Sequence, residues 1–120
     1  MIVIISLISC DGNDIYINKE NKTIYSSHEI KKLSIELSKD IYFISCDINQ
    51  EGDKCIRLDS IPEYYHVVKN GHSRFQYNNV NKNGYNLLFK NEFYTIDNHT
   101  IGDAASRCIT FNTDSNACIR

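Results

Sequence analysis

Short apolar segments separated by polar turn residues make up most of this chain, and one segment has a different period. There, Ser26 and Glu29 have the spacing of a helix capping box. The apolar residues that follow lie at i, i+3 and i+7 on a single stripe: Ile30, Leu33 and Leu37. Lysine and glutamate residues fall on the opposite side. We therefore predict one amphipathic helix that ends at Asp40.

The rest of the chain has the pattern of short β-strands joined by turns. The ranges predicted as strands are 15–17, 23–25, 41–48, 54–58, 63–69, 73–79, 85–90, 93–97 and 108–111. A single apolar helical stripe needs one sheet face to cover it. We therefore predict one α+β domain spanning residues 1–120, in which one α-helix packs on a twisted antiparallel β-sheet.

Residues 2–9 form an apolar run at the start of the chain. The run is similar to the hydrophobic region of a signal peptide, but basic residues before it and a small-x-small cleavage site are missing. We predict that it forms a strand of a mature protein whose native signal was removed and to which Met1 was added. A truncated or unusual signal peptide is the alternative. Two N-glycosylation sequons, which begin at Asn21 and Asn98, are compatible with secretion.

The overall composition is that of an ordinary globular protein, with 42% hydrophobic and 23% charged residues. The formal net charge is −2. A protein that binds nucleic acid mainly through phosphate attraction is usually more basic, so this class is disfavoured. Basic residues interleaved with aromatic ones between residues 54 and 82 leave RNA binding as an alternative.

The chain contains five cysteines, at positions Cys10, Cys46, Cys55, Cys108 and Cys118. Neither a CxxC motif nor a Cys/His zinc spacing occurs, so we predict no metal site and no cofactor. Five cysteines in so short a chain favour an oxidised, secreted domain. We predict that Cys10 bridges to the C-terminal region, at Cys118 or alternatively Cys108, and that Cys46 and Cys55 are the other disulfide candidates. The sequence does not determine the connectivity.

The segment 42–52 is an apolar strand that runs into a turn formed by Asn49, Gln50, Glu51 and Gly52. It resembles a strand and turn of the small secreted fungal ribonucleases of the T1/F1 kind, where Tyr-x-His leads into Asn-x-Glu-Gly. The order of other features also follows that family: an early Cys, the Ser-Ser-x-Glu helix start, the segments 63–66 and 84–89, and a late Cys. The resemblance implies that the turn 49–52 holds the edge of a base; a plain tight turn is the alternative.

These ribonucleases use two His, a Glu and an Arg for proton transfer and phosphate binding. The matching positions in this chain are Phe43 or Ile44, His66, Asn86, and Asp97 or Phe111. None of the family's catalytic residue types is kept in register, so the resemblance implies a ribonuclease-like fold without the activity. The candidates for a displaced catalytic set are His66, Arg74 and His99.

An eroded ribonuclease-like protein of this size resembles the powdery mildew RNase-like effectors associated with haustoria. The resemblance implies a secreted virulence or avirulence effector that is delivered to the host cell cytoplasm. It would bind a host plant protein or RNA without catalysis and be recognised by an NLR immune receptor, with no membrane partner. The segments 49–54, 69–74 and 78–84 are the expected recognition surface. The alternatives are an active secreted guanyl-type ribonuclease or ribotoxin, and a secreted binding domain unrelated to ribonucleases.

Overall fold

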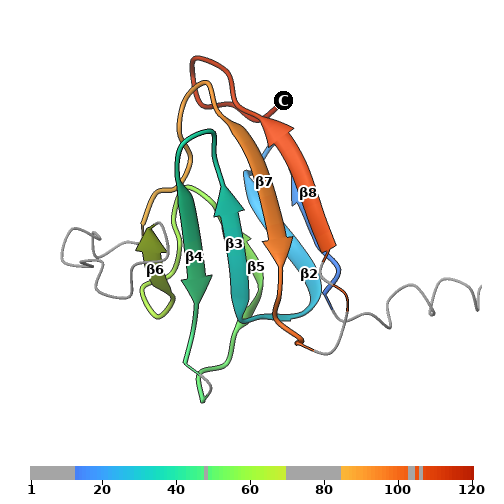
Figure 1. Ribbon diagram of the computed structural model, residues 1–120. Helices are drawn as coiled ribbons and strands as arrows, with labels where there is room; N and C mark the ends of the chain where they lie inside the picture. Colours follow the sequence, from blue (N-terminus) through green and yellow to red (C-terminus); the bar gives the residue numbers. More distant parts are fainter. Residues whose placement is uncertain (1–12, 48, 70–84, 103–104, 106) are drawn as a thin grey trace, which may run out of the picture.

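The computed structural model describes residues 13–47, 49–69, 85–102, 105 and 107–120. Within those residues the chain forms eight strands in two antiparallel sheets, and no helix (Figure 1). Sheet A has the order β1-β2-β5 and contains β1 (Tyr16–Asn18), β2 (Thr23–Ile30) and β5 (Asp53–Arg57). Sheet B has the order β6-β4-β3-β7-β8 and contains β6 (His66–Lys69), β4 (Ile41–Ser45), β3 (Lys32–Glu36), β7 (Phe93–Asn98) and β8 (Arg107–Asn112).

The two sheets face each other and enclose the hydrophobic core, as in a β-sandwich (Figure 1). Alternate residues of each strand point inward, so cross-strand neighbours form apolar rows. In sheet A such a row is Ile17, Ile24 and Ile56. In sheet B the equivalent row is Tyr42, Ile35 and Ile96. Because side chains alternate between the two faces of each strand, buried apolar residues recur every second residue and not with the helical period of 3.6.

A corner between β2 and β3 joins the sheets, since β2 ends at Ile30 in sheet A and β3 begins at Lys32 in sheet B. The backbone amides of Lys31 and Lys32 both donate to Thr100 Oγ1, at 2.8 and 3.1 Å. Backbone groups at such a corner need partners outside the regular ladder. The Thr100 hydroxyl supplies that partner.

The Tyr65 hydroxyl secures the other side of this corner. It donates to the Ile30 carbonyl oxygen at 2.6 Å and accepts from the Asp53 amide at 2.9 Å. Ile30 and Asp53 are register partners beyond an irregularity in the β2–β5 pairing. The hydroxyl therefore links the two strands where their regular ladder is interrupted. Gly52 lies against this point, because a Cβ there would meet the Ile30 carbonyl oxygen at 2.5 Å.

The prediction of an α+β fold with one helix is wrong, because the segment predicted as the helix forms β2, the corner and β3. The apolar residues Leu33, Ile35 and Leu37 are all buried, which is a period of two. A helix would have left Ile35 on its polar side, whereas here its exposed fraction is 0%. The supposed capping box is also not one: Glu29 Oε1 accepts from the Gly52 amide at 3.1 Å.

Most of the predicted strands that fall on described residues are present within a few residues of their predicted bounds. The exception is 85–90, which forms an isolated bridge from Tyr85 to Ile61 and otherwise no strand. The predicted strands 2–9 and 73–79 lie outside the described residues, as does most of the two predicted recognition segments 69–74 and 78–84.

Candidate functional site

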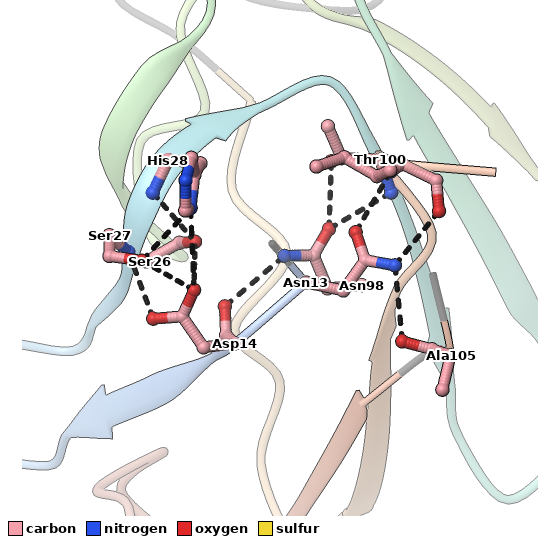
Figure 2. Close-up of polar contacts among 9 residues, drawn as sticks. Asn13, Asp14, Ser26, Ser27, His28, Asn98, Thr100 and Ala105 are labelled. Carbon is pink, nitrogen blue, oxygen red and sulfur yellow. Dashed lines mark hydrogen bonds and ion pairs between the residues drawn. The ribbon is translucent and has the colours of Figure 1, made fainter. Parts of the chain in front are cut away.

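A dense polar cluster joins the start of β1 to β2 and to the end of β7 (Figure 2). At its centre is the buried carboxylate of Asp14. It accepts hydrogen bonds from the Ser27 hydroxyl at 2.7 Å, the Ser27 amide at 2.9 Å and the Ser26 hydroxyl at 3.3 Å. Burial by itself raises the pKa of this carboxyl, but the hydrogen bonds from Ser27 and Ser26 outweigh it, and the pKa of Asp14 lies below its ordinary value.

The cluster contains a Ser, a His and an Asp, the residue types of a hydrolase triad, but their order in space is different. Ser27 Oγ lies between the other two groups, 2.7 Å from Asp14 Oδ1 and 3.0 Å from His28 Nδ1. In a triad the His lies in the middle and removes the proton of the Ser. Here the nearest acceptor for the Ser27 proton is a buried carboxylate. The arrangement therefore clamps strands together and does not activate a nucleophile.

The other half of the cluster consists of Asn13 and Asn98, both buried (Figure 2). Asn13 pairs with the backbone of Ile101, its Oδ1 accepting at 2.8 Å and its Nδ2 donating at 3.0 Å. Asn98 Nδ2 donates to the Asp14 carbonyl oxygen at 3.2 Å, and its Oδ1 accepts from the Thr100 hydroxyl at 2.7 Å. The sequon at Asn98 is thus a structural element of the folded domain, and its amide nitrogen is buried away from a glycosylating enzyme. Asn21 of the other sequon is exposed.

The histidines proposed as a displaced catalytic set lie apart on the outer face of sheet B. His66 Nε2 is 3.0 Å from Asp47 Oδ1, and His99 Nε2 is 3.1 Å from Ser34 Oγ. His66 belongs to β6, whereas His99 follows β7 and donates its amide to the Lys32 carbonyl. Strands β4 and β3 separate them. Three strand spacings of about 4.8 Å place their backbones roughly 14 Å apart.

Hydrogen bonding to one phosphate brings two ring nitrogens within about 7 Å of each other. His66 and His99 are each engaged by a different partner, in opposite halves of the sheet. The third member, Arg74, lies outside the described residues. The structure therefore does not bring His66 and His99 together at one reaction centre.

The remaining positions matched to the ribonuclease site are scattered. Ile44 and Phe111 are core residues, and Phe111 stacks on Tyr94 with ring centroids 4.7 Å apart. Phe43 and Asp97 point outward from sheet B on either side of Ser34. Asn86 uses its side-chain oxygen to accept from the Leu88 amide at 2.9 Å. These residues do not line a common cleft.

The turn predicted to bind a base connects β4 of sheet B with β5 of sheet A. Gln50 donates its amide to the Asp47 carbonyl at 2.9 Å, and Gly52 approaches the corner closely enough to exclude a side chain. Asn49 and Glu51 are exposed. The close approach of Gly52 to the Ile30 carbonyl accounts for a glycine at this position by packing.

The four cysteines of the described residues are free thiols: Cys46, Cys55, Cys108 and Cys118. Cys55 lies on β5 and Cys108 on β8, both exposed, and burial raises the pKa of the Cys46 thiol. Cys10 lies outside the described residues. A disulfide between Cys46 and Cys55 is not formed in the structure.

An exposed aromatic surface lies on the outer face of sheet A. Tyr16, Tyr25 and Cys55 are direct cross-strand neighbours on β1, β2 and β5, and all three are exposed. Tyr64 lies beside them, because its hydroxyl donates to the Asp53 carboxylate on the same strand as Cys55. The exposed fractions of Tyr16, Tyr25 and Tyr64 are 57%, 37% and 39%. We call these four residues the tyrosine face.

The tyrosine face was not found among the sequence candidates, although a signal exists. In the segments 15–17 and 23–25 the tyrosines occupy the polar phase of an alternating strand, opposite buried isoleucines. A tyrosine in that phase is exposed by the same alternation that buries its neighbours. The row itself, however, depends on the register of three strands that are distant in sequence.

Two negative findings hold for the residues that the structure describes. Among them, no group of three or more His, Cys, Asp or Glu side chains is arranged to hold a metal ion. No helix with the length and hydrophobicity needed to cross a membrane is found in the same residues.

No family model, no curated protein and no solved structure matches this chain. Its function therefore has to be argued from its own residues.

Proposed function

We propose that this domain is a non-enzymatic binding module, that its ligand is another protein, and that the tyrosine face is the contact surface. The observation that carries the proposal is the alignment of Tyr16 and Tyr25 in one cross-strand row on the solvent side of sheet A. Tyrosine is enriched at the centres of protein interfaces, where its ring is buried while its hydroxyl finds a polar partner.

Hydrogen bonds hold two tyrosine side chains of the tyrosine face. The Tyr25 hydroxyl accepts from Asn21 Nδ2 at 3.1 Å, and the Tyr64 hydroxyl donates to Asp53. Burial, followed by the bond to the Asp53 carboxylate, raises the pKa of Tyr64 to about 12. Side chains that are already ordered lose less conformational entropy on binding, which favours affinity.

The size of the face limits the kind of interface it can form. Three strands spaced by about 4.8 Å, with a mean length of about five residues at 3.4 Å per residue, give a flat area of roughly 240 Å². A standard interface buries about 800 Å² on each partner. A protein partner that buries a standard area must therefore also contact residues outside the tyrosine face. Candidates are Arg57 at the end of β5 and Asp59, which form a two-bond ion pair at 2.9 Å. We expect a weak or transient complex.

The separation of His66 from His99 favours this binding role over the ribonuclease alternative, which requires them to meet at one phosphate. The role of a virulence effector that binds a host protein or an NLR receptor remains a prediction from sequence resemblance. It no longer has the support of the helix-on-sheet fold, and the proposal of a protein-binding module depends only on the tyrosine face.

Site-specific photo-crosslinking tests this proposal. A benzophenone amino acid placed at Tyr16 should crosslink a discrete protein from the native environment, and the same group at Phe93, on the outer face of sheet B, should not. Excess unlabelled wild-type protein should compete for the crosslink, and the double variant Tyr25→Ser/Tyr64→Ser should compete at least tenfold less well. Equal crosslinking from Tyr16 and Phe93, or undiminished competition by the double variant, would refute the assignment.

A further inference from the structure

We propose that Cys10 is a lipid-modification site, at which a diacylglyceryl group is attached through a thioether, so that the β-sandwich is tethered to a membrane surface. This inference is independent of the partner proposed above. It starts from the four residues that end the apolar run, Leu7-Ile8-Ser9-Cys10. A leucine three residues before a cysteine and a small residue directly before it form the recognition pattern of bacterial lipoprotein processing.

The residues before this motif are mostly apolar, as lipoprotein processing requires. Every position from Ile2 to Ile8 except Ser6 is a large apolar residue. This run is typical of the hydrophobic region of an export signal. A small-x-small cleavage site is missing because the lipoprotein pathway cleaves before the modified cysteine and needs a small residue only at the position before it. Ser9 meets that need.

Asn13, the third residue after Cys10, belongs to the folded domain. Only Asp11 and Gly12 separate Cys10 from Asn13, whose side chain is buried and bonded to the backbone of Ile101. No buried side-chain nitrogen or oxygen of the described part of the chain lacks a hydrogen-bond partner. Asn13 is thus fixed in the sandwich three residues after Cys10, so a lipid on Cys10 would hold the sandwich close to the membrane surface.

The cysteines that were expected to bridge to Cys10 are free in the structure. Cys118 and Cys108 are exposed thiols. One sulfur cannot form both a disulfide and a thioether, so the lipid assignment replaces the predicted disulfide. It also replaces the expectation of a freely diffusing secreted protein, while keeping the expectation of export.

The chemistry needs a phosphatidylglycerol-type lipid as co-reactant and no redox step. The Cys10 thiolate attacks the lipid carbon that carries the phosphate: a C–S bond forms, the C–O bond breaks, and its electron pair leaves with glycerol phosphate, which takes up the thiol proton. Water then hydrolyses the Ser9–Cys10 peptide bond and frees a new amino group on Cys10. Two acyl chains meet the requirement for stable membrane anchoring, which a single chain does not.

The test expresses the full chain in a bacterium that carries out this processing, both as printed and with two lysines inserted after Met1. The second form supplies the basic segment that export signals carry. Cells are labelled with radioactive palmitate, and the mature N-terminus is determined by mass spectrometry. We expect label in the membrane fraction, and a mature chain that starts at Cys10 and carries the diacylglyceryl mass, from at least one form.

Two substitutions and a matched control make the outcome specific. Cys10→Ser should abolish the label, and Ser9→Glu should reduce it at least tenfold although the thiol is retained. Cys118→Ser removes a thiol of the folded domain and should leave labelling unchanged. The proposal is overturned if neither form is labelled, if Cys10→Ser remains labelled, or if the mature chain starts at another residue.

Discussion

The substitution Tyr65→Phe tests the interpretation of the sheet-switching corner. It removes a single oxygen atom and leaves the ring in the core. That oxygen donates to the Ile30 carbonyl at 2.6 Å and accepts from the Asp53 amide at 2.9 Å. Ile30 has an exposed fraction of 0%, so water cannot replace the lost donor. The Asp53 amide is only partly buried.

The expected loss of folding stability can be estimated from the Ile30 carbonyl and the Asp53 amide. A buried backbone group without a partner costs about 1–3 kcal/mol. We assign about 2 kcal/mol to the Ile30 carbonyl and less than about 1 kcal/mol to the Asp53 amide, which solvent can reach in part. Tyr65→Phe should therefore lower the free energy of unfolding by about 2–3 kcal/mol, a substantial part of the 5–15 kcal/mol typical of a domain.

Urea unfolding followed by far-UV circular dichroism measures this loss, with an unchanged m-value showing that only stability differs. The adjacent Tyr64→Phe is the matched control. It also removes a bonded hydroxyl, but from a side chain that is 39% exposed, and should cost no more than about 0.5 kcal/mol. If the two variants lose equal stability, or if Tyr65→Phe behaves like wild type, the hydroxyl does not secure the corner.

Four further substitutions probe the same framework, each by chemical unfolding. Thr100→Val removes the acceptor of two corner amides and should cost about 2 kcal/mol, whereas Thr100→Ser should cost under about 1 kcal/mol. Gly52→Ala forces a Cβ against the Ile30 carbonyl and should cost about 1–3 kcal/mol, with Gly102→Ala, which meets no atom within 4 Å, as a near-neutral control. Lys22→Gly should raise stability by up to about 1 kcal/mol, because Lys22 has a φ of 59°, and Lys22→Ala should give no such gain. Asp14→Asn should lower stability by about 2 kcal/mol near pH 7. The pKa of Asp14 is lowered on folding, so its contribution is present above the ordinary carboxyl pKa of about 4 and is lost as the pH falls through the folded value. The difference in unfolding free energy between wild type and Asp14→Asn should therefore become smaller below about pH 4. A difference that stays constant with pH would contradict the stabilising role of the Asp14 carboxylate.

The sequence by itself determined the local features of this protein. Alternating patterns and turn residues placed β1, β4, β5, β7 and β8 within a few residues of their observed bounds, because side-chain alternation and turn chemistry are properties of neighbouring residues. The sequence also contains the pattern that contradicts the predicted helix. Leu33, Ile35 and Leu37 alternate with polar residues, and this period of two competes directly with the i, i+3, i+7 stripe from Ile30.

Only the tertiary structure decided between the two periods and assembled the surfaces. A stripe containing Ile30, Leu33 and Leu37 is compatible with a helix until β4 and β7 are seen to pair with both edges of β3, which satisfies its backbone as a strand. The tyrosine face and the separation of His66 from His99 likewise follow from the order of strands that are distant in the chain. That order is set by how the apolar faces of two sheets bury each other, and no local pattern of residues encodes it.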